Sequence, residues 1–266
     1  MKFRLKRNLF GINIDAIGME EAVGRLREWI ADRSTQCRYV VTPNVDHAVL
    51  LQEHSGLRRS YRDANLILAD GHPIVWASRL LRKPLPERVP GSELVPSLFE
   101  ACNADPGGTR LRVFLLGAAP GVAARAAARM RRQWPNVQTV GVYSPPPGFE
   151  NDVEESNYIL GRIALSRPDV LIVGLGAPKQ EVWVHQHRHQ IRAKAALCVG
   201  ATIDFLAGEK RRAPKWMQRT GIEWLHRMCS EPQRLVKRYA KDAWVFPQLV
   251  WQQMKMDQAG TGRLSQ

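Results

Sequence analysis

The chain has 266 residues, of which 44% are hydrophobic and 24% charged, so it can bury a sizeable core as one large α/β domain, alone or with a smaller appendage. Its net charge of +14 points to an anionic partner: nucleic acid, an acidic membrane surface or a phosphorylated substrate. Four scattered cysteines without a CxxC pair argue against a disulfide framework and a zinc site, and suit a reducing cytoplasm. No apolar run approaches the roughly 18 to 20 residues that cross a bilayer, and we find no signal peptide.

Short apolar runs alternate with helical patterns along the first 200 residues. Strands are predicted at 39–42, 66–69, 112–116, 137–143, 170–173 and 196–199. Helices are predicted at 19–32, 46–60, 73–81, 93–104, 121–133, 153–166 and 180–191. Strands that are apolar throughout are typical of a mostly parallel sheet with helices on both faces. The strand signals stop at the stretch GEKRRAP (208–214), which divides the chain into a core of residues 1–207 and an appendage of residues 208–266.

Polar or glycine-rich turns follow four of the predicted strands. They are TPNVDH (42–47), ADGHP (69–73), the turn within LLGAAPGVAARAA (115–127) and GLGAPKQE (174–181). Ligands of parallel sheets bind beyond the carboxyl ends of the strands, where these turns meet. The turn that begins at Gly117 opens a helix whose free N–H groups could hold a phosphate, although it is not a GxGxxG motif. The four turns together predict a ligand site at this edge.

Each polar residue in these turns also has an ordinary structural interpretation. Thr42, Asn44 and Asp70 stand where side chains cap the next helix, and position alone leaves capping and a role at the ligand equally open. An aspartate at a strand end can also face the crevice and accept a proton. Arg88 by itself suits a solvated charge, and Lys179 with Gln180 could simply open a helix.

Metal binding and the common nucleophile motifs are not favoured. Glu181, His185 and His189 share one helical face at i, i+4 and i+8, but such a set is more often a polar surface than a metal site. The sequence holds no DxD motif, Walker A motif or GxSxG motif. A bound diphosphate would therefore be neutralised by arginine and lysine.

The appendage is basic and rich in tryptophan. From residue 208 onward it holds 12 Lys and Arg against 5 Asp and Glu, and four of the eight tryptophans. A cationic stripe is predicted at i, i+3, i+4 and i+7 by Arg234, Lys237, Arg238 and Lys241. An apolar face lies beside it, made by Leu235, Tyr239, Ala243 and Phe246, with Trp244 adjacent and Pro247 expected to end the helix. This pattern is typical of a helix that lies on an anionic membrane; the alternative is a helix packed on its own domain with a solvated basic face.

Seven ordered motifs together resemble the WecG/TagA/CpsF glycosyltransferase family, also called glycosyltransferase family 26. They are TPN (42–44), ADG (69–71), RVPGSEL (88–94), LLGAAPGVA (115–123), VGLGAPKQE.W (173–183), CVGATIDFLAGEKRRAPKW (198–216) and GIEWLHRMCSEPQRLVKRY (221–239). The resemblance covers nearly the whole chain from about Gly11.

The resemblance implies a Rossmann-like core with a C-terminal helical appendage. It also implies inverting transfer of a sugar from a UDP-sugar to a polyprenyl-diphosphate-linked saccharide, without an obligatory metal or other cofactor. The sugar is N-acetylmannosamine, N-acetylmannosaminuronic acid or glucose. The expected location is the cytoplasmic face of the bacterial inner membrane, bound peripherally.

The resemblance also assigns roles to residues. Asp70 matches the general base, and Thr42, Asn44, Arg88 and Gln180 match pocket residues. Arg227, Arg234 and Lys237 match the basic residues expected to close over the diphosphate of the UDP-sugar. The turns at the strand ends add Gly117, Ala118, Gly176 and Lys179 as further expected contacts to the UDP-sugar. The basic amphipathic pattern of the appendage, and not the resemblance, predicts contacts to the membrane from Arg234, Arg238, Lys241 and Trp244.

Other classes of function stay open from the sequence. The high charge also suits a nucleic-acid-binding protein, but no recognised binding motif is present. A nicotinamide-dependent oxidoreductase would share the sheet, yet the full glycine fingerprint and the acidic residue that holds the ribose are missing. A non-catalytic scaffold and a homo-oligomer are also compatible with the sequence. We expect a chain truncated from about Gly208 to keep a folded, soluble core but little transferase activity.

Overall fold

The computed structural model describes residues 5–34, 36–105, 110–210, 213–214, 216–217, 221, 223–230 and 232–262, without the side chains of 227, 230, 234 and 260–262. Its centre is a six-stranded sheet in the order β4-β3-β8-β7-β5-β6, and every neighbouring pair is parallel. The strands are β3 (Arg38–Val41), β4 (Leu66–Ile67), β5 (Leu111–Gly117), β6 (Val137–Tyr143), β7 (Val170–Gly174) and β8 (Ala195–Cys198). The predicted α/β class with a mostly parallel sheet is confirmed.

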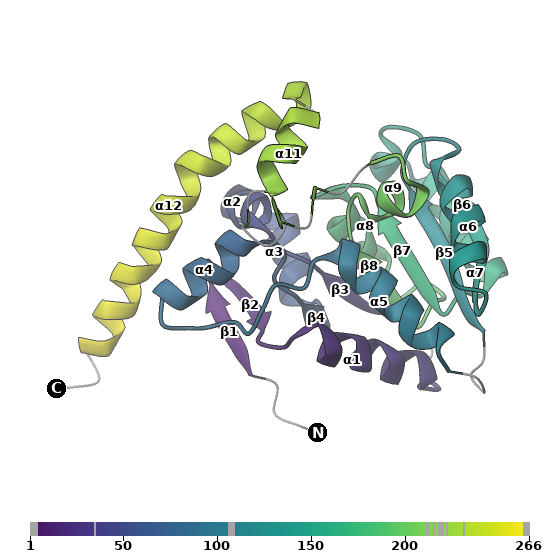
Figure 1. The fold of residues 1–266 in the computed structure, drawn as a ribbon, viewed down its shortest axis with the longest axis horizontal. Coiled ribbons are helices and arrows are strands. Elements are labelled where there is room, and N and C mark those ends of the chain that lie inside the picture. The colour runs from purple at the N-terminus through teal and green to yellow at the C-terminus, as the bar shows by residue number, and fades with distance from the viewer. Residues whose placement is uncertain are drawn as a thin grey trace.

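Helices cover both faces of the sheet (Figure 1). They are α1 (Met19–Ala31), α2 (Val45–Glu53), α3 (Ser55–Arg62), α4 (His72–Leu80), α5 (Gly91–Asn103), α6 (Val122–Gln133), α7 (Val153–Ser166), α8 (Lys179–His187), α9 (Thr202–Ala207), α11 (Glu223–Ser230) and α12 (Pro232–Gly262), with a 3-10 turn, η1, at Phe149–Asn151. Successive strand residues join different cores: Tyr39 and Val41 pack toward α2, α3 and α8, whereas Val40 packs toward α1 and α5. Two buried faces explain why the strands are apolar throughout.

The predicted helix over 46–60 is in fact two helices, and the break lies at His54. This residue ends α2 through its N–H bond to the Leu50 carbonyl, and its ring nitrogen accepts from the N–H of Leu57 to cap α3. The helix predicted over 180–191 ends at His187.

An N-terminal hairpin precedes α1 and was not predicted. Strands β1 (Lys6–Leu9) and β2 (Ile12–Asp15) pair antiparallel across a two-residue turn, in which Phe10 has φ +56° and Gly11 has φ +79°. Two positive φ values are required by the tightest hairpin turns, but a phenylalanine is an unusual choice there. Its ring is 6% exposed, which shows that packing, not turn propensity, selects it.

The expectation that Pro247 ends the last helix is wrong, because α12 continues through it to Gly262. The second half of α12 packs on the hairpin: the Phe246 and Phe10 rings lie 5.1 Å apart, and the Phe10 N–H donates to Gln253 Oε1 at 3.2 Å. Leu249 is buried in the same core. This packing outweighs the backbone hydrogen bond that a proline removes from a helix interior.

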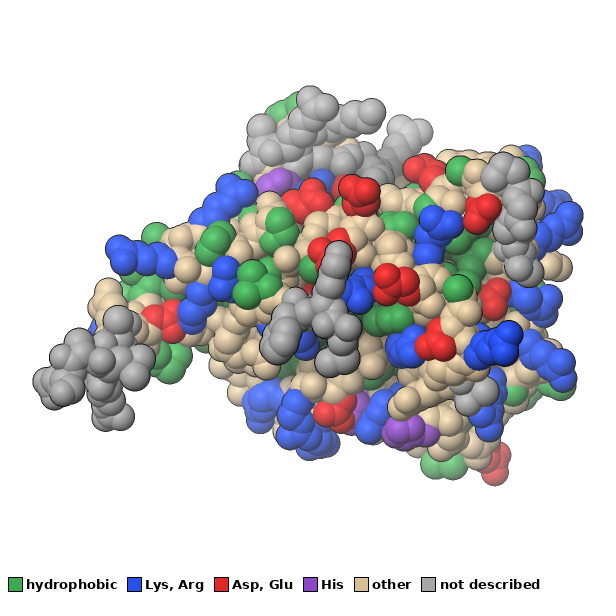
Figure 2. All heavy atoms as spheres, turned by 90° about the horizontal axis from the view of Figure 1, so that it is seen from below, with side chains coloured by type: hydrophobic (Ala, Val, Ile, Leu, Met, Phe, Trp, Pro, Cys, Tyr) green, Lys and Arg blue, Asp and Glu red, His purple; other side chains and the backbone are tan. Residues whose placement is uncertain are grey.

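The basic side chains do not form one continuous patch on the face shown in Figure 2. Lys and Arg are spread over the sheet domain and over the extension that contains the end of α12, with Asp and Glu among them. In the part of the chain that the structure describes, no helix is long and apolar enough to span a bilayer.

Candidate active site

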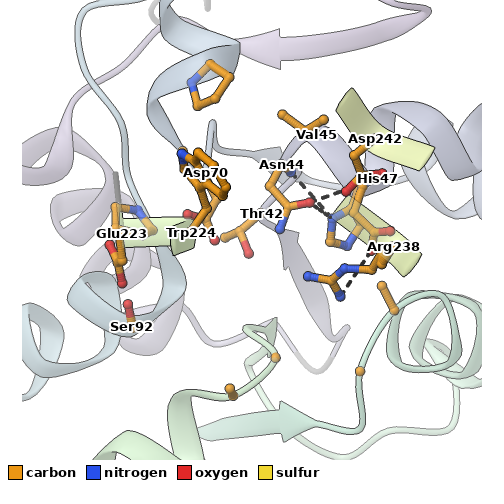
Figure 3. Close-up of a pocket in the computed structure, with 18 of the residues that line it drawn as sticks. Thr42, Asn44, Val45, His47, Asp70, Ser92, Glu223, Trp224, Arg238 and Asp242 are labelled. Carbon is orange, nitrogen blue, oxygen red and sulfur yellow. Dashed lines mark hydrogen bonds and ion pairs between the residues drawn. The ribbon is translucent and has the colours of Figure 1, made fainter. Parts of the chain in front are cut away.

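A pocket of about 560 Å³ opens at the carboxyl edge of the sheet, beyond β4, β3, β8 and β7. Its volume is in the range of small-molecule sites. One wall comes from the turns after these four strands, and the other from α9, α11 and α12. The core and the C-terminal helices therefore share one site, which Figure 3 shows in close-up.

The turn after β3 supplies Thr42 and Asn44. The Thr42 hydroxyl donates to the carbonyl of Cys198 at 3.2 Å, which fixes this strand end to β8. Asn44 caps α2: its side-chain oxygen accepts from the N–H of His47 at 3.3 Å. Both residues also line the pocket. For Asn44, capping and facing the ligand are thus roles of one side chain.

Asp70 lies in the pocket and is not the cap of the helix that follows. The N-cap of α4 is Gly71, whose φ of +106° suits glycine and leaves Asp70 one residue outside the helix. The Asp70 N–H donates to the carbonyl of Pro43 at 2.8 Å, which holds the turns after β3 and β4 side by side. The sequence left capping and catalysis open for Asp70, and in the structure Gly71, not Asp70, holds the N-cap position of α4.

Arg88, Gly176 and Gln180 also line the pocket. The Arg88 guanidinium is paired with Glu93 at 2.8 Å and is 18% exposed. Gln180 is 2% exposed; its side-chain oxygen accepts from the N–H of Gly200 at 3.2 Å. Six predicted site residues, from four separate stretches of the sequence, are therefore brought to one cavity: Thr42, Asn44, Asp70, Arg88, Gly176 and Gln180.

A buried pair, His47 and Glu181, lies beside the pocket, and His47 is part of its lining. The His47 Nε2 atom is 3.3 Å from Glu181 Oε1, and the same oxygen accepts from the Gln180 amide at 2.6 Å. Burial lowers the pKa of His47, but the hydrogen bond and charge of Glu181, with the charges of Asp46 and Asp70, outweigh it and raise the pKa above its usual value. The imidazole is thus held toward its charged form.

Three of the residues expected to contact the UDP-sugar, Gly117, Ala118 and Lys179, do not line the pocket. The Gly117 backbone is so close to Gly174 that a Cβ would lie 2.4 Å from its carbonyl oxygen. The Lys179 ammonium is turned to Glu150, at 2.5 Å. Gly117 therefore serves the close packing of β5 against β7 in this structure.

The side chains of the predicted basic stripe of α12 do not share one environment: some contact the pocket or α2, and others are exposed to solvent. Arg238 lines the pocket and pairs with Asp46 at 3.5 Å, and Lys241 pairs with Glu53 of α2 at 2.9 Å. Trp244 is 75% exposed and Lys237 is exposed. The side chains of Arg227 and Arg234 lie outside the described residues.

Sequence reasoning missed several residues of the pocket. They are His47, His72, Ser92, Asp204, Phe205, Lys210, Glu223, Trp224 and Asp242. His47 alone carried a local signal, since it stands three residues after the capping Asn44, where a capping-box partner is expected. The acidic side chain of Asp242 is buried against α2; burial and the charge of Asp46 raise its pKa to about 6.

The three residues Glu181, His185 and His189, for which the sequence does not favour a metal site, do not come together in the structure. Glu181 turns inward to His47, whereas His185 Nε2 contacts Asp63 at 2.9 Å and His189 lies beyond the end of the helix. Among the described residues, no group of three or more His, Cys, Asp and Glu side chains could hold a metal ion.

Comparison of the sequence with known proteins identifies the protein family of this chain. The model of the glycosyl transferase WecG/TagA/CpsF family matches residues 7–260. A Staphylococcus aureus (strain MRSA252) protein named N-acetylglucosaminyldiphosphoundecaprenol N-acetyl-beta-D-mannosaminyltransferase is 30% identical over 230 residues, which are 86% of this chain and 87% of that protein. The proteins of the same name from strains MW2 and N315 match over the same shares. This chain, with its pocket between a parallel sheet and a C-terminal helical appendage, belongs to the WecG/TagA/CpsF family of glycosyl transferases.

Proposed function

We propose that this protein transfers one sugar from a UDP-sugar to a saccharide carried on a polyprenyl diphosphate, with inversion at the anomeric carbon and without an obligatory metal ion. The observation that carries the proposal is the convergence of Asp70 with Thr42, Asn44, Arg88 and Gln180 in one pocket. The names of the relatives favour N-acetylmannosamine as the sugar and N-acetylglucosaminyl diphosphate as the acceptor head group. N-acetylmannosaminuronic acid and glucose are the alternative donors, and assembly of a surface polysaccharide or exopolysaccharide is the expected process.

Asp70 acts as the general base in this mechanism. It takes the proton of the acceptor hydroxyl as that oxygen forms its bond to the anomeric carbon, and the bond from this carbon to UDP breaks on the opposite side. A positioned base of this kind is worth about 10²–10⁴ in rate. The leaving UDP gains negative charge, and Arg88, Lys210 and Arg238 line the pocket where this charge develops.

We also propose that the protein works at the cytoplasmic face of the membrane as a peripheral protein. The support is the outward side of α12, where Trp244 is 75% and Trp251 58% exposed, with the Lys255 ammonium 3.5 Å from the Trp251 ring centroid. Tryptophan beside lysine is typical of the boundary between lipid head groups and acyl chains. The lipid tail of the acceptor would keep the substrate in the same plane.

A donor screen tests the proposed function. Full-length protein and an N-acetylglucosaminyl-diphosphate-polyprenol acceptor are incubated with UDP-N-acetylmannosamine, its uronic acid or UDP-glucose, with and without EDTA. We expect one donor to be consumed at a rate that EDTA does not change; no transfer from any of the three would refute the proposal.

Two substitutions then test the base. Asp70→Asn should lower kcat by about 10²–10⁴ with the fold intact. Asp63→Asn, which changes a partly exposed carboxylate paired with His185 outside the pocket, is the matched control and should keep its activity. Undiminished turnover of Asp70→Asn would place the base elsewhere.

A further inference from the structure

The carboxylate of Glu181 lies at the centre of a buried hydrogen-bonded chain. Its Oε1 atom accepts from the Gln180 amide at 2.6 Å and lies 3.3 Å from His47 Nε2. On the other side of the imidazole, His47 Nδ1 is 3.0 Å from Asn44 Oδ1. Glu181 itself is fully buried and does not line the pocket. The other three residues of this hydrogen-bonded series, Gln180, His47 and Asn44, do line it.

The chain joins parts of the pocket that the sequence keeps far apart. His47 and Glu181 are separated by 134 positions, and Gln180 and Gly200 by 20. Through Gln180, the carboxylate also reaches the Gly200 N–H at the end of β8. The Glu181 carboxylate thus connects His47 in the first turn of α2, Gln180 in the first turn of α8 and, through Gln180, the backbone after β8.

Both ring nitrogens of His47 face protein groups, namely Asn44 and Glu181. An imidazole held at both ends connects its neighbours but cannot take a proton from a substrate without breaking a contact. This geometry leaves the base role proposed for Asp70 in place. It gives His47 the role of a rigid link.

Fold stability does not explain a buried carboxylate at this position. Taking an ionised carboxyl out of water is costly unless it is paired and hydrogen-bonded, and replacing a buried pair by apolar residues is often neutral for stability or better. Among the described residues, Glu181 Oε2 has no hydrogen-bond partner, so the pairing is also incomplete. A group retained at such cost beside a pocket is better explained by what it positions.

We propose that Glu181 is a positioning residue of the transferase site, holding Gln180 directly and Asn44 through His47. The inference rests on the proposed function, because these two side chains are expected to contact substrate. A displacement of about 1 Å at a reacting centre can cost about 10²-fold in rate, and this is the scale of effect a positioning group controls.

Glu181→Gln is the informative variant, since it keeps the shape and removes the charge. We expect kcat to fall by about 10- to 100-fold, with KM for the donor changed far less. Asn44→Ala and Glu181→Gln should also be non-additive, because the second change removes support from a side chain that is already gone. Unchanged kcat, or fully additive losses, would overturn the proposal.

The pH profile supplies a readout that a merely structural role would not move. The charged groups around His47 are Glu181 on α8, Asp46 on α2, Asp70 after β4 and Asp242 on α12, with Arg238 of α12 paired to Asp46. Without the Glu181 charge, the pKa of His47 should fall and its link to residue 181 should weaken at high pH. Activity of Glu181→Gln should therefore recover partly toward low pH; a profile parallel to that of the wild type would contradict the proposal.

Ser156→Ala is the matched control. It removes the buried hydrogen bond that Trp183 Nε1 of α8 donates to Ser156 Oγ of α7 at 3.1 Å, and neither residue lines the pocket. We expect a lower melting temperature with unchanged kcat. An equal loss of kcat in this variant would mean that any disturbance of α8 slows the enzyme, and would overturn the specific role of Glu181.

His47→Gln covers the case in which Glu181→Gln does not fold. It interrupts the connection from Glu181 to Asn44 and leaves the hydrogen bond from Gln180 to Glu181. We therefore expect kcat to fall below the wild-type value by less than the 10- to 100-fold expected for Glu181→Gln. Wild-type kcat in His47→Gln would refute the route through His47.

Nuclear magnetic resonance separates the inference from the proposed function. The His47 ring signal, assigned by its loss in His47→Gln, and the Asn44 side-chain amide signal are followed in wild type and in each folded variant. If the wild type transfers no sugar, the proposed function fails, yet a coupled shift of both signals on Glu181→Gln still supports positioning. Unmoved Asn44 and His47 signals refute positioning whether or not the protein is a transferase.

Discussion

The buried carboxyl group of Asp242, where α12 packs on α2, should make the free energy of unfolding of this protein depend on pH. Its side chain is 6% exposed, and burial together with the neighbouring Asp46 carboxylate raises its pKa from 3.8 to about 6. Arg238, His47 and Lys241 offset this only in part. At neutral pH the native protein therefore keeps an ionised carboxylate in a place that disfavours its charge.

The sign follows from the two pKa values. Below pH 3.8 both the folded and the unfolded carboxyl are neutral, so there is no penalty. Between pH 3.8 and about 6 the unfolded chain releases the proton that the folded protein retains, so stability falls as the pH rises. Above pH 6 the penalty is nearly constant and on the order of 3 kcal/mol, and roughly half of it develops between pH 5 and 7.5.

Asp242→Asn removes the titration and keeps the shape. We expect the stability of the variant relative to wild type to increase by roughly 1 to 2 kcal/mol between pH 5 and pH 7.5. Urea unfolding followed by tryptophan fluorescence at both pH values measures this difference, and groups common to both proteins cancel. A variant whose relative stability is the same at the two pH values, or falls at the higher one, would refute the reasoning.

Three further predictions concern packing, the membrane and the appendage. Gly117→Ala should destabilise the protein by at least about 2 kcal/mol in urea unfolding, because its φ is +118° and a Cβ would lie 2.4 Å from a backbone oxygen; Gly161→Ala, which meets nothing within 4 Å, is the control and should be neutral or stabilising. Replacing Trp244 and Trp251 together by Ala should lower co-sedimentation with anionic vesicles by about tenfold or more, whereas Gln248→Ala on the same exposed side should not. Removing residues 208–266 should abolish most transfer activity, since α11 and α12 form one wall of the pocket; an active truncated protein would contradict this.

The sequence determined the architecture because the relevant signals are local. Apolar runs separated by helical patterns require a sheet that is covered on both faces, and the carboxyl ends of its strands must lie along one edge. These local signals predict Thr42, Asp70 and Gln180 at the same edge of the sheet, and the structure brings all three into one pocket. The turns that carry them are read from a few consecutive residues.

Only the tertiary structure decided what depends on distant partners. Asp70 is outside the helix cap because Gly71 adopts φ +106°, and α12 passes Pro247 because its second half packs on a hairpin at the other end of the chain. The inward turn of Glu181 to His47 links residues 134 positions apart, and no periodicity along α8 distinguishes it from a polar surface. A sequence pattern determines which face of a helix or strand a residue is on. The group that the residue contacts there depends on how separate elements pack, and the chemistry of this pocket depends on those contacts.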